Sequence, residues 1–294
     1  MIQSPHEHHD WEKVLWKRQP YPDNYVPPSA FLASLRKNPN FRPYSYWPLV
    51  VLACSITQHL AIIFIFLAIF VRLKEQSMDP RSLICISVVF FFLGYATWNS
   101  LDQRTERGNR NANHLKAFKS AVMMFLTLMS LSPVLRTLTA ATSSDSIWAL
   151  ASILFSLNAL LSDYTATEMQ DTHEGLSSVL SMNAAVSASV VLASRLHTDV
   201  SVFALMLYSI QSFALYPMLR HRLQTLPVAL WLLFTIALWT LAVWLIGNLS
   251  RSLMWLSFST LSFVTVIAPG VLVWAQRYKN IIRGPWDVAV PKVN

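Results

Sequence analysis

Long apolar stretches free of acidic residues alternate with short polar loops through most of the chain. Eight such stretches occur, and each is close to the roughly 20 residues that a helix needs to cross a bilayer. Their bounds are Trp47–Val71, Ser82–Leu101, Ala117–Leu135, Ser146–Ser162, Gly175–Ser194, Val200–Leu219, Pro227–Gly247 and Ser252–Gln276. This pattern predicts an all-α polytopic membrane protein, folded as a bundle of about eight transmembrane helices.

Polar segments flank the apolar region on both sides. We therefore expect three parts: an N-terminal segment (1–46), a transmembrane domain (47–276) and a C-terminal tail (277–294). Within the first part, Trp11–Arg18 and Ser29–Lys37 are predicted to form short amphipathic cytosolic helices. The second gathers its apolar side chains on one face, which is typical of a helix lying on a membrane surface or on a partner.

The composition supports the membrane class and excludes several others. Hydrophobic residues make up 54% of the 294 positions and charged residues only 13%, whereas soluble domains carry about 25% charged residues. An ordinary soluble enzyme and a disordered chain are therefore excluded. Two cysteines within apolar stretches do not build a disulfide framework. The net charge of +8 is spread over the loops, which argues against nucleic acid as a partner.

The basic residues predict the orientation in the membrane. Seventeen of them lie in the N-terminal segment, in the loops after the second, fourth and sixth spans, and in the C-terminal tail, counting Lys119 in the first turn of the third span, while the other loops hold six. Cytosolic loops are enriched in Lys and Arg, so both termini are expected in the cytosol. The loop Asp163–Glu174 has four carboxylates and no basic residue, but acidic residues contribute little to topology.

Groups able to perform acid–base chemistry are scarce. His59 is the one ionisable residue deep within a span, and either a hydrogen-bonded structural role or catalysis and proton relay would explain it. The loop with Asp163, Tyr164 and His173 could hold acid–base groups or a metal, or could be a solvated docking surface. Because neither pattern is specific, we predict no catalytic residue, no metal site and no cofactor. The lack of carboxylates inside the spans also argues against an ion-coupled transporter.

One predicted helix carries a ladder of small residues, one at every fourth position. Such a ladder allows two helices to approach closely in lipid, where apolar burial alone gives no driving force. It consists of Ser177, Ser181, Ala185, Ser189 and Ala193. The ladder is therefore a helix-packing surface, either within this chain's own bundle or against another subunit, and the pattern leaves both possibilities open.

Several longer motifs resemble those of the PIG-C family. They are WEKVLWKRQPYPDNYV at Trp11–Val26, SPVLRTLT at Ser132–Thr139 followed by Asp145-Ser146-Ile147, Asp163–Tyr164, SMNAAVSASVVLASRL at Ser181–Leu196, FALYPMLR at Phe213–Arg220 and GPWD at Gly284–Asp287. They occur in the family's order and cover nearly the whole chain. Two stretches depart from the family pattern, Pro27–Ser29 and the acidic loop after Tyr164.

The resemblance implies a specific function. PIG-C is a subunit of the phosphatidylinositol N-acetylglucosaminyltransferase complex, which transfers GlcNAc from UDP-GlcNAc to phosphatidylinositol at the endoplasmic reticulum membrane, the first step of GPI-anchor biosynthesis. In this family the chemistry belongs to PIG-A, and PIG-H, PIG-P, PIG-Q and PIG-Y are the other implied partners. The resemblance thus implies a non-catalytic scaffold subunit.

Four basic residues are candidates for contact with a lipid headgroup. Lys116, Lys119, Arg220 and Arg222 are expected at the cytosolic interface, where cations attract anionic phospholipids. Ordinary topology-setting charge would explain the same residues. Two other functions remain open: an independent lipid-modifying enzyme that uses Asp163, His173 or His59, and a transporter.

Overall fold

The computed structural model describes residues 18–20, 22, 25, 35–38, 41–101, 110–139, 142–164, 175–280 and 282–283. At 101, 110–118 and 175–177 it describes the path of the helix but not the side chains. The chain divides into two compact units. One is Tyr46–Gly270, which holds most of the helices, and the other combines the residues up to Ser45 with those from Val271 onward.

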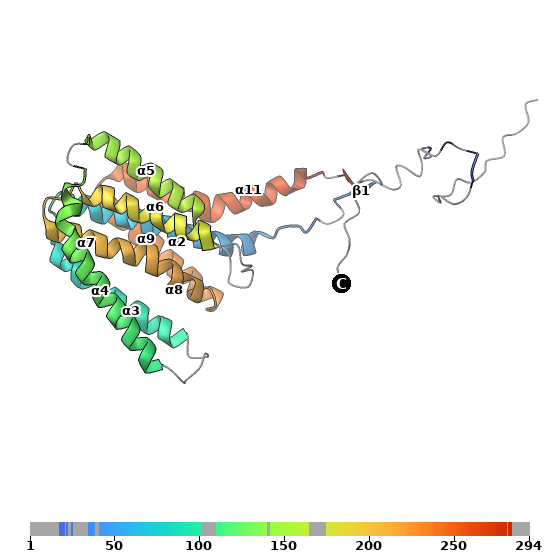
Figure 1. The fold of residues 1–294 in the computed structure, drawn as a ribbon. Coiled ribbons are helices and arrows are strands. Elements are labelled where there is room, and N and C mark those ends of the chain that lie inside the picture. Colours follow the sequence, from blue (N-terminus) through green and yellow to red (C-terminus); the bar gives the residue numbers. More distant parts are fainter. Residues whose placement is uncertain are drawn as a thin grey trace, which may run out of the picture. The chain divides into compact units, whose positions relative to one another are not determined.

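Helices dominate the described residues, as the apolar pattern predicts (Figure 1). They are α2 (Tyr46–Lys74), α3 (Pro80–Leu101), α4 (Arg110–Thr137), α5 (Ser144–Leu161), α6 (Gly175–Ala193), α7 (Asp199–Ile210), η2 (Gln211–Leu215), α8 (Tyr216–Leu223), α9 (Val228–Gly247), α10 (Arg251–Ser262), η3 (Phe263–Ile267), α11 (Ala268–Ala275) and η4 (Gln276–Tyr278). The prediction of an all-α polytopic membrane protein is confirmed.

The number of spans differs slightly from the predicted eight. Among the described residues, seven helices are long and apolar enough to cross a membrane. Two of them are composite, because α7, η2 and α8 form one span (Asp199–Leu223) and α10 to η4 form another (Arg251–Tyr278). The described apolar part of α6, Ser178–Ala193, is shorter than the others. The remaining predicted spans agree with helices whose ends lie within three residues of the predicted ends, except that α4 begins at Arg110 because its polar first turns are also helical.

Helix α2 lies at the centre of the larger unit. Most of its side chains are buried, as expected for a helix that other helices surround, and it packs against α5, α7, α9 and α10 (Figure 1). Phe66 of α2 is fully buried and its ring contacts those of Phe155, Tyr208 and Phe213. Helices α5 and α6 run side by side on one side of this core.

Side-chain caps and prolines explain several helix boundaries. Ser143 and Thr198 accept hydrogen bonds from the backbone N–H groups three residues later and so cap α5 and α7. The two π-helical segments, η2 and η3, each lie just before a proline, Pro217 or Pro269. A proline provides no backbone N–H for the carbonyl four residues earlier, and a wider turn accommodates this loss. The π-helical turn η3 is thus explained by Pro269, which follows it.

The smaller unit contains a short antiparallel strand pair. Strand β1 (Arg36–Lys37) pairs with β2 (Ile282–Arg283), and the Gln276 side chain bonds both backbone groups of Tyr44. The prediction that the helix Ser29–Lys37 extends to Lys37 is wrong, because Arg36 and Lys37 direct their backbone groups to a strand partner. Residues 29–34 of that predicted helix and most of Trp11–Arg18 lie outside the described residues, as does GPWD at 284–287.

Candidate functional site

The most unusual side chain of the larger unit is Arg220 of α8, which is fully buried. Its Nη1 donates to the carbonyl oxygen of Ser55 on α2 at 3.4 Å, and its Nη2 donates to the carbonyl oxygen of Asp163, just after α5. The guanidinium also lies over the ring of Tyr164, 5.2 Å from its centroid. One arginine thus joins α2, α8 and the start of the loop that follows α5.

Burial and charge set the protonation of the neighbouring Tyr164. Burial raises the pKa of the Tyr164 phenol, and the Arg220 guanidinium opposes this shift only in part. The phenol therefore remains protonated at neutral pH, and its hydroxyl donates to the carbonyl oxygen of Ala159 at 2.7 Å. A neutral ring that holds a last-turn carbonyl of α5 and faces a guanidinium is a structural arrangement rather than a general base.

His59 joins α2 to α5 and α6 through Asn158. Asn158 donates its amide hydrogens to the carbonyl and hydroxyl oxygens of Ser181, each at 2.9 Å, so its Oδ1 is left to accept. That oxygen lies 2.7 Å from Nε2 of His59. The proton of a neutral imidazole must then sit on Nε2, and Nδ1 accepts from the Ser162 hydroxyl at 3.5 Å. Both ring nitrogens of His59 are therefore engaged within the bundle, Nε2 by Asn158 and Nδ1 by Ser162.

A second chain of bonds ties α2 to α8 and α9. The Tyr216 hydroxyl donates to Oε1 of Gln58 at 2.7 Å, and the Gln58 amide donates to the hydroxyl of Thr235 at 2.8 Å. The Gln224 amide donates to the hydroxyl of Ser55 at 3.0 Å. We call the whole set of bonded polar residues the Arg220 cluster, which consists of Ser55, Gln58, His59, Asn158, Ser162, Asp163, Tyr164, Ser181, Tyr216, Arg220, Gln224 and Thr235.

The Arg220 cluster brings distant sequence motifs together. Asp163–Tyr164, the start of SMNAAVSASVVLASRL at Ser181 and the end of FALYPMLR at Arg220 all meet there. Its side chains mostly bond each other and backbone carbonyls inside the bundle, which leaves little for a substrate. Within the described part of the chain, no group of three or more His, Cys, Asp or Glu side chains could hold a metal.

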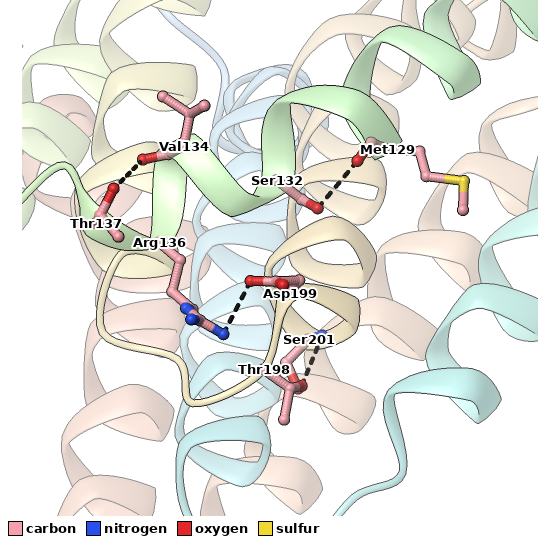
Figure 2. A network of polar contacts seen from close by, with 8 residues as sticks. All are labelled: Met129, Ser132, Val134, Arg136, Thr137, Thr198, Asp199 and Ser201. Atoms are coloured by element: carbon pink, nitrogen blue, oxygen red, sulfur yellow. Dashed lines mark hydrogen bonds and ion pairs between the residues drawn. The ribbon is translucent and has the colours of Figure 1, made fainter.

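A second polar region lies at the opposite end of α5 and α6 (Figure 2). Arg136 of α4 forms an ion pair with Asp199 at the start of α7, with 2.9 Å between Nη1 and Oδ1. Both side chains are more than 40% exposed. Nearby, Arg195 donates to the carbonyl oxygens of Thr139 and Thr142. We call this region of Arg136, Asp199 and Arg195 the Arg136–Asp199 end. It brings the motif SPVLRTLT (Ser132–Thr139) next to LASRL, the last five residues of the Ser181–Leu196 motif.

The small-residue ladder lies inside the chain's own bundle. Ser181, Ala185, Ser189 and Ala193 are all buried, and α6 packs against α5 and α7. The Ser209 hydroxyl of α7 donates to that of Ser189 at 2.6 Å. The side chain of Ser177 lies outside the described residues. At the four described positions, neighbouring helices of the same chain already occupy the surface.

The four basic headgroup candidates lie in different surroundings. Arg220 is buried inside the bundle, where backbone carbonyls of α2 and of the post-α5 loop bind its guanidinium, so its side chain does not face a lipid headgroup. Arg222 is exposed and lies over the Trp98 ring at 5.0 Å. Lys119 is also exposed, and the side chain of Lys116 lies outside the described residues.

Sequence reasoning missed Gln58, Asn158 and Tyr216, which complete the Arg220 cluster. A usable signal was present, because α2 carries the polar run Ser55, Thr57, Gln58 and His59 within an otherwise apolar helix. Polar side chains at membrane depth require partners, but a linear pattern does not say which helix provides them. His173 of the acidic loop and the loop's last carboxylates lie outside the described residues.

Known proteins of one family match this chain over most of its length. A family model described as phosphatidylinositol N-acetylglucosaminyltransferase, GPI2, matches residues 11–287. The GPI2 subunit of this transferase from Schizosaccharomyces pombe is 35% identical over 96% of this chain and 87% of its own length. A subunit of the same transferase from Homo sapiens is 33% identical over 95% of this chain and 92% of its own length. No solved structure matches. The extent of these matches shows that the chain belongs to the GPI2 (PIG-C) family of phosphatidylinositol N-acetylglucosaminyltransferase subunits.

Proposed function

We propose that this chain is a non-catalytic membrane scaffold subunit of the complex that transfers GlcNAc from UDP-GlcNAc to phosphatidylinositol, in the first step of GPI-anchor biosynthesis. The relatives are named as subunits of that transferase, and the chain matches nearly their full length. The proposed location is the endoplasmic reticulum membrane, with both termini in the cytosol, as the distribution of basic residues predicts.

One observation carries the non-catalytic part of the proposal. The side chains best suited to chemistry, His59, Tyr164 and Arg220, bond other helices and backbone carbonyls inside the bundle. A general acid or base must reach the proton that it transfers, and an imidazole whose two nitrogens are both engaged within the bundle does not. The same bonds are what a scaffold needs, because they fix the relative positions of α2, α5, α6 and α8.

The proposed partners follow from the family resemblance. PIG-A would provide the transferase chemistry, and PIG-H, PIG-P, PIG-Q and PIG-Y would be the other subunits. The helix-packing ladder is internal, so we propose that partners contact other faces of the bundle. Exposed apolar side chains on α3 and α4 offer such faces, among them Phe90, Phe92, Met123, Leu126 and Met129.

The headgroup role is proposed for the exposed basic residues. Lys119 and Arg222, with Lys116, are expected to attract the anionic inositol phospholipid to the cytosolic leaflet, each contributing about 1 kcal/mol at the surface. Arg220, being buried, is proposed to hold the bundle end on which these cations lie. Neutralising Lys119 and Arg222 together should weaken the dependence of the transferase on anionic lipid without changing topology. An unchanged lipid dependence would refute the headgroup role.

Activity of the isolated chain tests the proposal directly. The protein is purified without PIG-A, in mild detergent with phosphatidylinositol, and GlcNAc transfer from UDP-GlcNAc is measured. We expect no transfer above the detergent blank, and activity restored on addition of PIG-A with the remaining subunits. Robust transfer by the chain alone would overturn the scaffold assignment in favour of an independent lipid-modifying enzyme.

A further inference from the structure

A groove lies between α9 and α10, and its lining includes no residue of the Arg220 cluster and neither residue of the Arg136–Asp199 pair. Its volume is about 390 Å³, and it is lined mainly by large apolar side chains. The residues that line it are Trp239, Thr240, Val243, Trp244, Gly247, Asn248, Met254 and Phe258. This volume lies at the lower end of the range for small-molecule sites, about 300–1,000 Å³. The groove lies entirely within the larger unit of the chain.

The shape of the groove comes from its two ends. At one end the rings of Trp239 and Phe258 stack at 5.4 Å and close the gap between the helices. At the other end, Gly247 leaves space that a side chain would fill, since a Cβ there would lie 3.0 Å from Sδ of Met254. Gly247 is the last residue of α9, so the absence of a side chain there opens the groove towards the α9–α10 turn.

The interior of the groove exposes few hydrogen-bonding groups to an occupant. The hydroxyl of Thr240 bonds carbonyl oxygens of its own helix, at Ile236 and Ala237. The indole nitrogen of Trp239 is buried and has no hydrogen-bond partner within the described part of the chain, so this residue presents its ring rather than its N–H to the groove. Polar groups appear at the open end, with Asn248 in the lining and Arg251 three residues further along the chain.

The length of the groove indicates what kind of molecule it can bind. From Trp239 to Asn248 the helix rises roughly 14 Å at 1.5 Å per residue, which is about half of the roughly 30 Å hydrocarbon core. A transmembrane helix from a partner would need a surface about twice as long, whereas one lipid tail occupies a single leaflet. The closed end, at Trp239 and Phe258, is expected near mid-membrane, and the polar end, at Asn248 and Arg251, near the interface. A phospholipid has the same arrangement, with its tail end at mid-membrane and its headgroup at the interface.

We propose that the α9–α10 groove binds one acyl chain of a phospholipid from the leaflet next to the α9–α10 turn. The tail lies against Trp239, Val243 and Phe258 with its end at the stacked rings, and the headgroup lies beside Asn248 and Arg251. In the orientation proposed above, this is the leaflet opposite the one in which the transferase acts, so the bound lipid is structural rather than a substrate.

The test uses the full chain within its complex, in membranes that contain a phosphatidylcholine with a photoreactive diazirine near the end of its acyl chain. After irradiation, labelled positions are mapped by mass spectrometry. We expect labelling concentrated on residues 239–258. Thr240→Trp and Gly247→Leu fill the groove from its two ends and should each reduce this labelling to the level of other lipid-facing positions. Leu233→Trp, at an exposed position outside the lining on the same helix, should leave it unchanged.

Two results would overturn the proposal. Labelling spread evenly over the exposed faces of α3, α4 and α9 would mean that the groove holds no lipid in preference to the bulk membrane. Loss of a partner subunit in Thr240→Trp, with labelling at 239–258 already low in the unsubstituted complex, would mean that a protein helix occupies the groove. Thermal unfolding of each variant checks the fold, and the use of two filling variants keeps the test valid if one of them fails to assemble.

Discussion

The two polar ends of the bundle hold their arginines in opposite ways. At one end Arg220 is fully buried and is bound by backbone carbonyls and the Tyr164 ring. At the other end Arg136 forms an ion pair with Asp199, and both side chains are more than 40% exposed. The first arrangement tolerates no change without loss of the bonds from α8 to two other segments, whereas the second competes with solvent or lipid headgroups.

This difference indicates where the fold is fixed. A buried cation is costly to desolvate, so it is retained only where several hydrogen bonds compensate it. An exposed ion pair contributes little because the surroundings screen it. The Arg220 cluster therefore determines how α2, α5, α6 and α8 pack, while the Arg136–Asp199 end mainly aligns the turns between helices. The predictions below test this contrast.

The largest effect is expected at Arg220. Arg220→Ala removes two charge-assisted hydrogen bonds and leaves the carbonyls of Ser55 and Asp163 without these donors, which should destabilise the protein by about 3 kcal/mol or more. Arg220→Lys should recover only part of this, because an ammonium lacks the planar fork that reaches both carbonyls. The midpoint of thermal unfolding in detergent and the yield of monodisperse protein measure the effect.

Arg222 provides the matched control for that substitution. It lies two residues further along α8, is exposed, and places its guanidinium over the ring of Trp98. Arg222→Ala should lower stability by at most about 1 kcal/mol. If Arg222→Ala destabilised the protein as much as Arg220→Ala, burial would not distinguish the two positions and the contrast would fail.

The next effect is expected at Asn158, which joins His59 to Ser181. Asn158→Leu removes the acceptor of the His59 Nε2–H and the donors to Ser181, so buried polar groups lose their partners at a cost of about 2–3 kcal/mol. Asn183→Ala, on the exposed side of α6, should change stability by no more than about 0.5 kcal/mol. Equal unfolding temperatures for the two variants would count against a structural role for His59.

A smaller effect is expected at the helix-packing ladder. Ala185 is fully buried between α6 and its neighbours, so Ala185→Leu should overpack the interface and cost about 1–3 kcal/mol. Ser187→Leu, two residues away on an exposed face, should be tolerated. If Ala185→Leu left the isolated chain stable but released a partner subunit, the ladder would belong to an interface between subunits.

The smallest effect is expected at the exposed ion pair. A double-mutant cycle with Arg136→Ala and Asp199→Ala should give a coupling energy of about 0.2–1 kcal/mol, and the coupling should decrease as salt concentration rises. The coupling energy is obtained from the unfolding midpoints of the unsubstituted protein, the two single variants and the double variant. A coupling energy above about 2 kcal/mol would mean that the two polar ends contribute similarly to stability, which contradicts the contrast between them.

The sequence predicted the helices well and the contacts poorly. Apolar stretches placed the spans within a few residues because bilayer thickness fixes their length. The position of Arg220 was not predictable in this way, because a basic residue near a span end usually marks the interface, and only the approach of Ser55 and the post-α5 loop buries it. The π-helical turn before Pro217 was also missed. Proline predicts a disturbance, but the surrounding packing decides its form.

Specific activity per assembled complex tests the scaffold assignment most directly. His59→Gln and Asp163→Ala are introduced into the full complex, and both the amount of assembled complex and the rate of GlcNAc transfer are measured. A scaffold predicts that any loss of transfer follows the loss of assembled complex, so the rate per complex stays constant. A normal amount of assembled complex with abolished transfer would place chemistry on this chain and contradict the account.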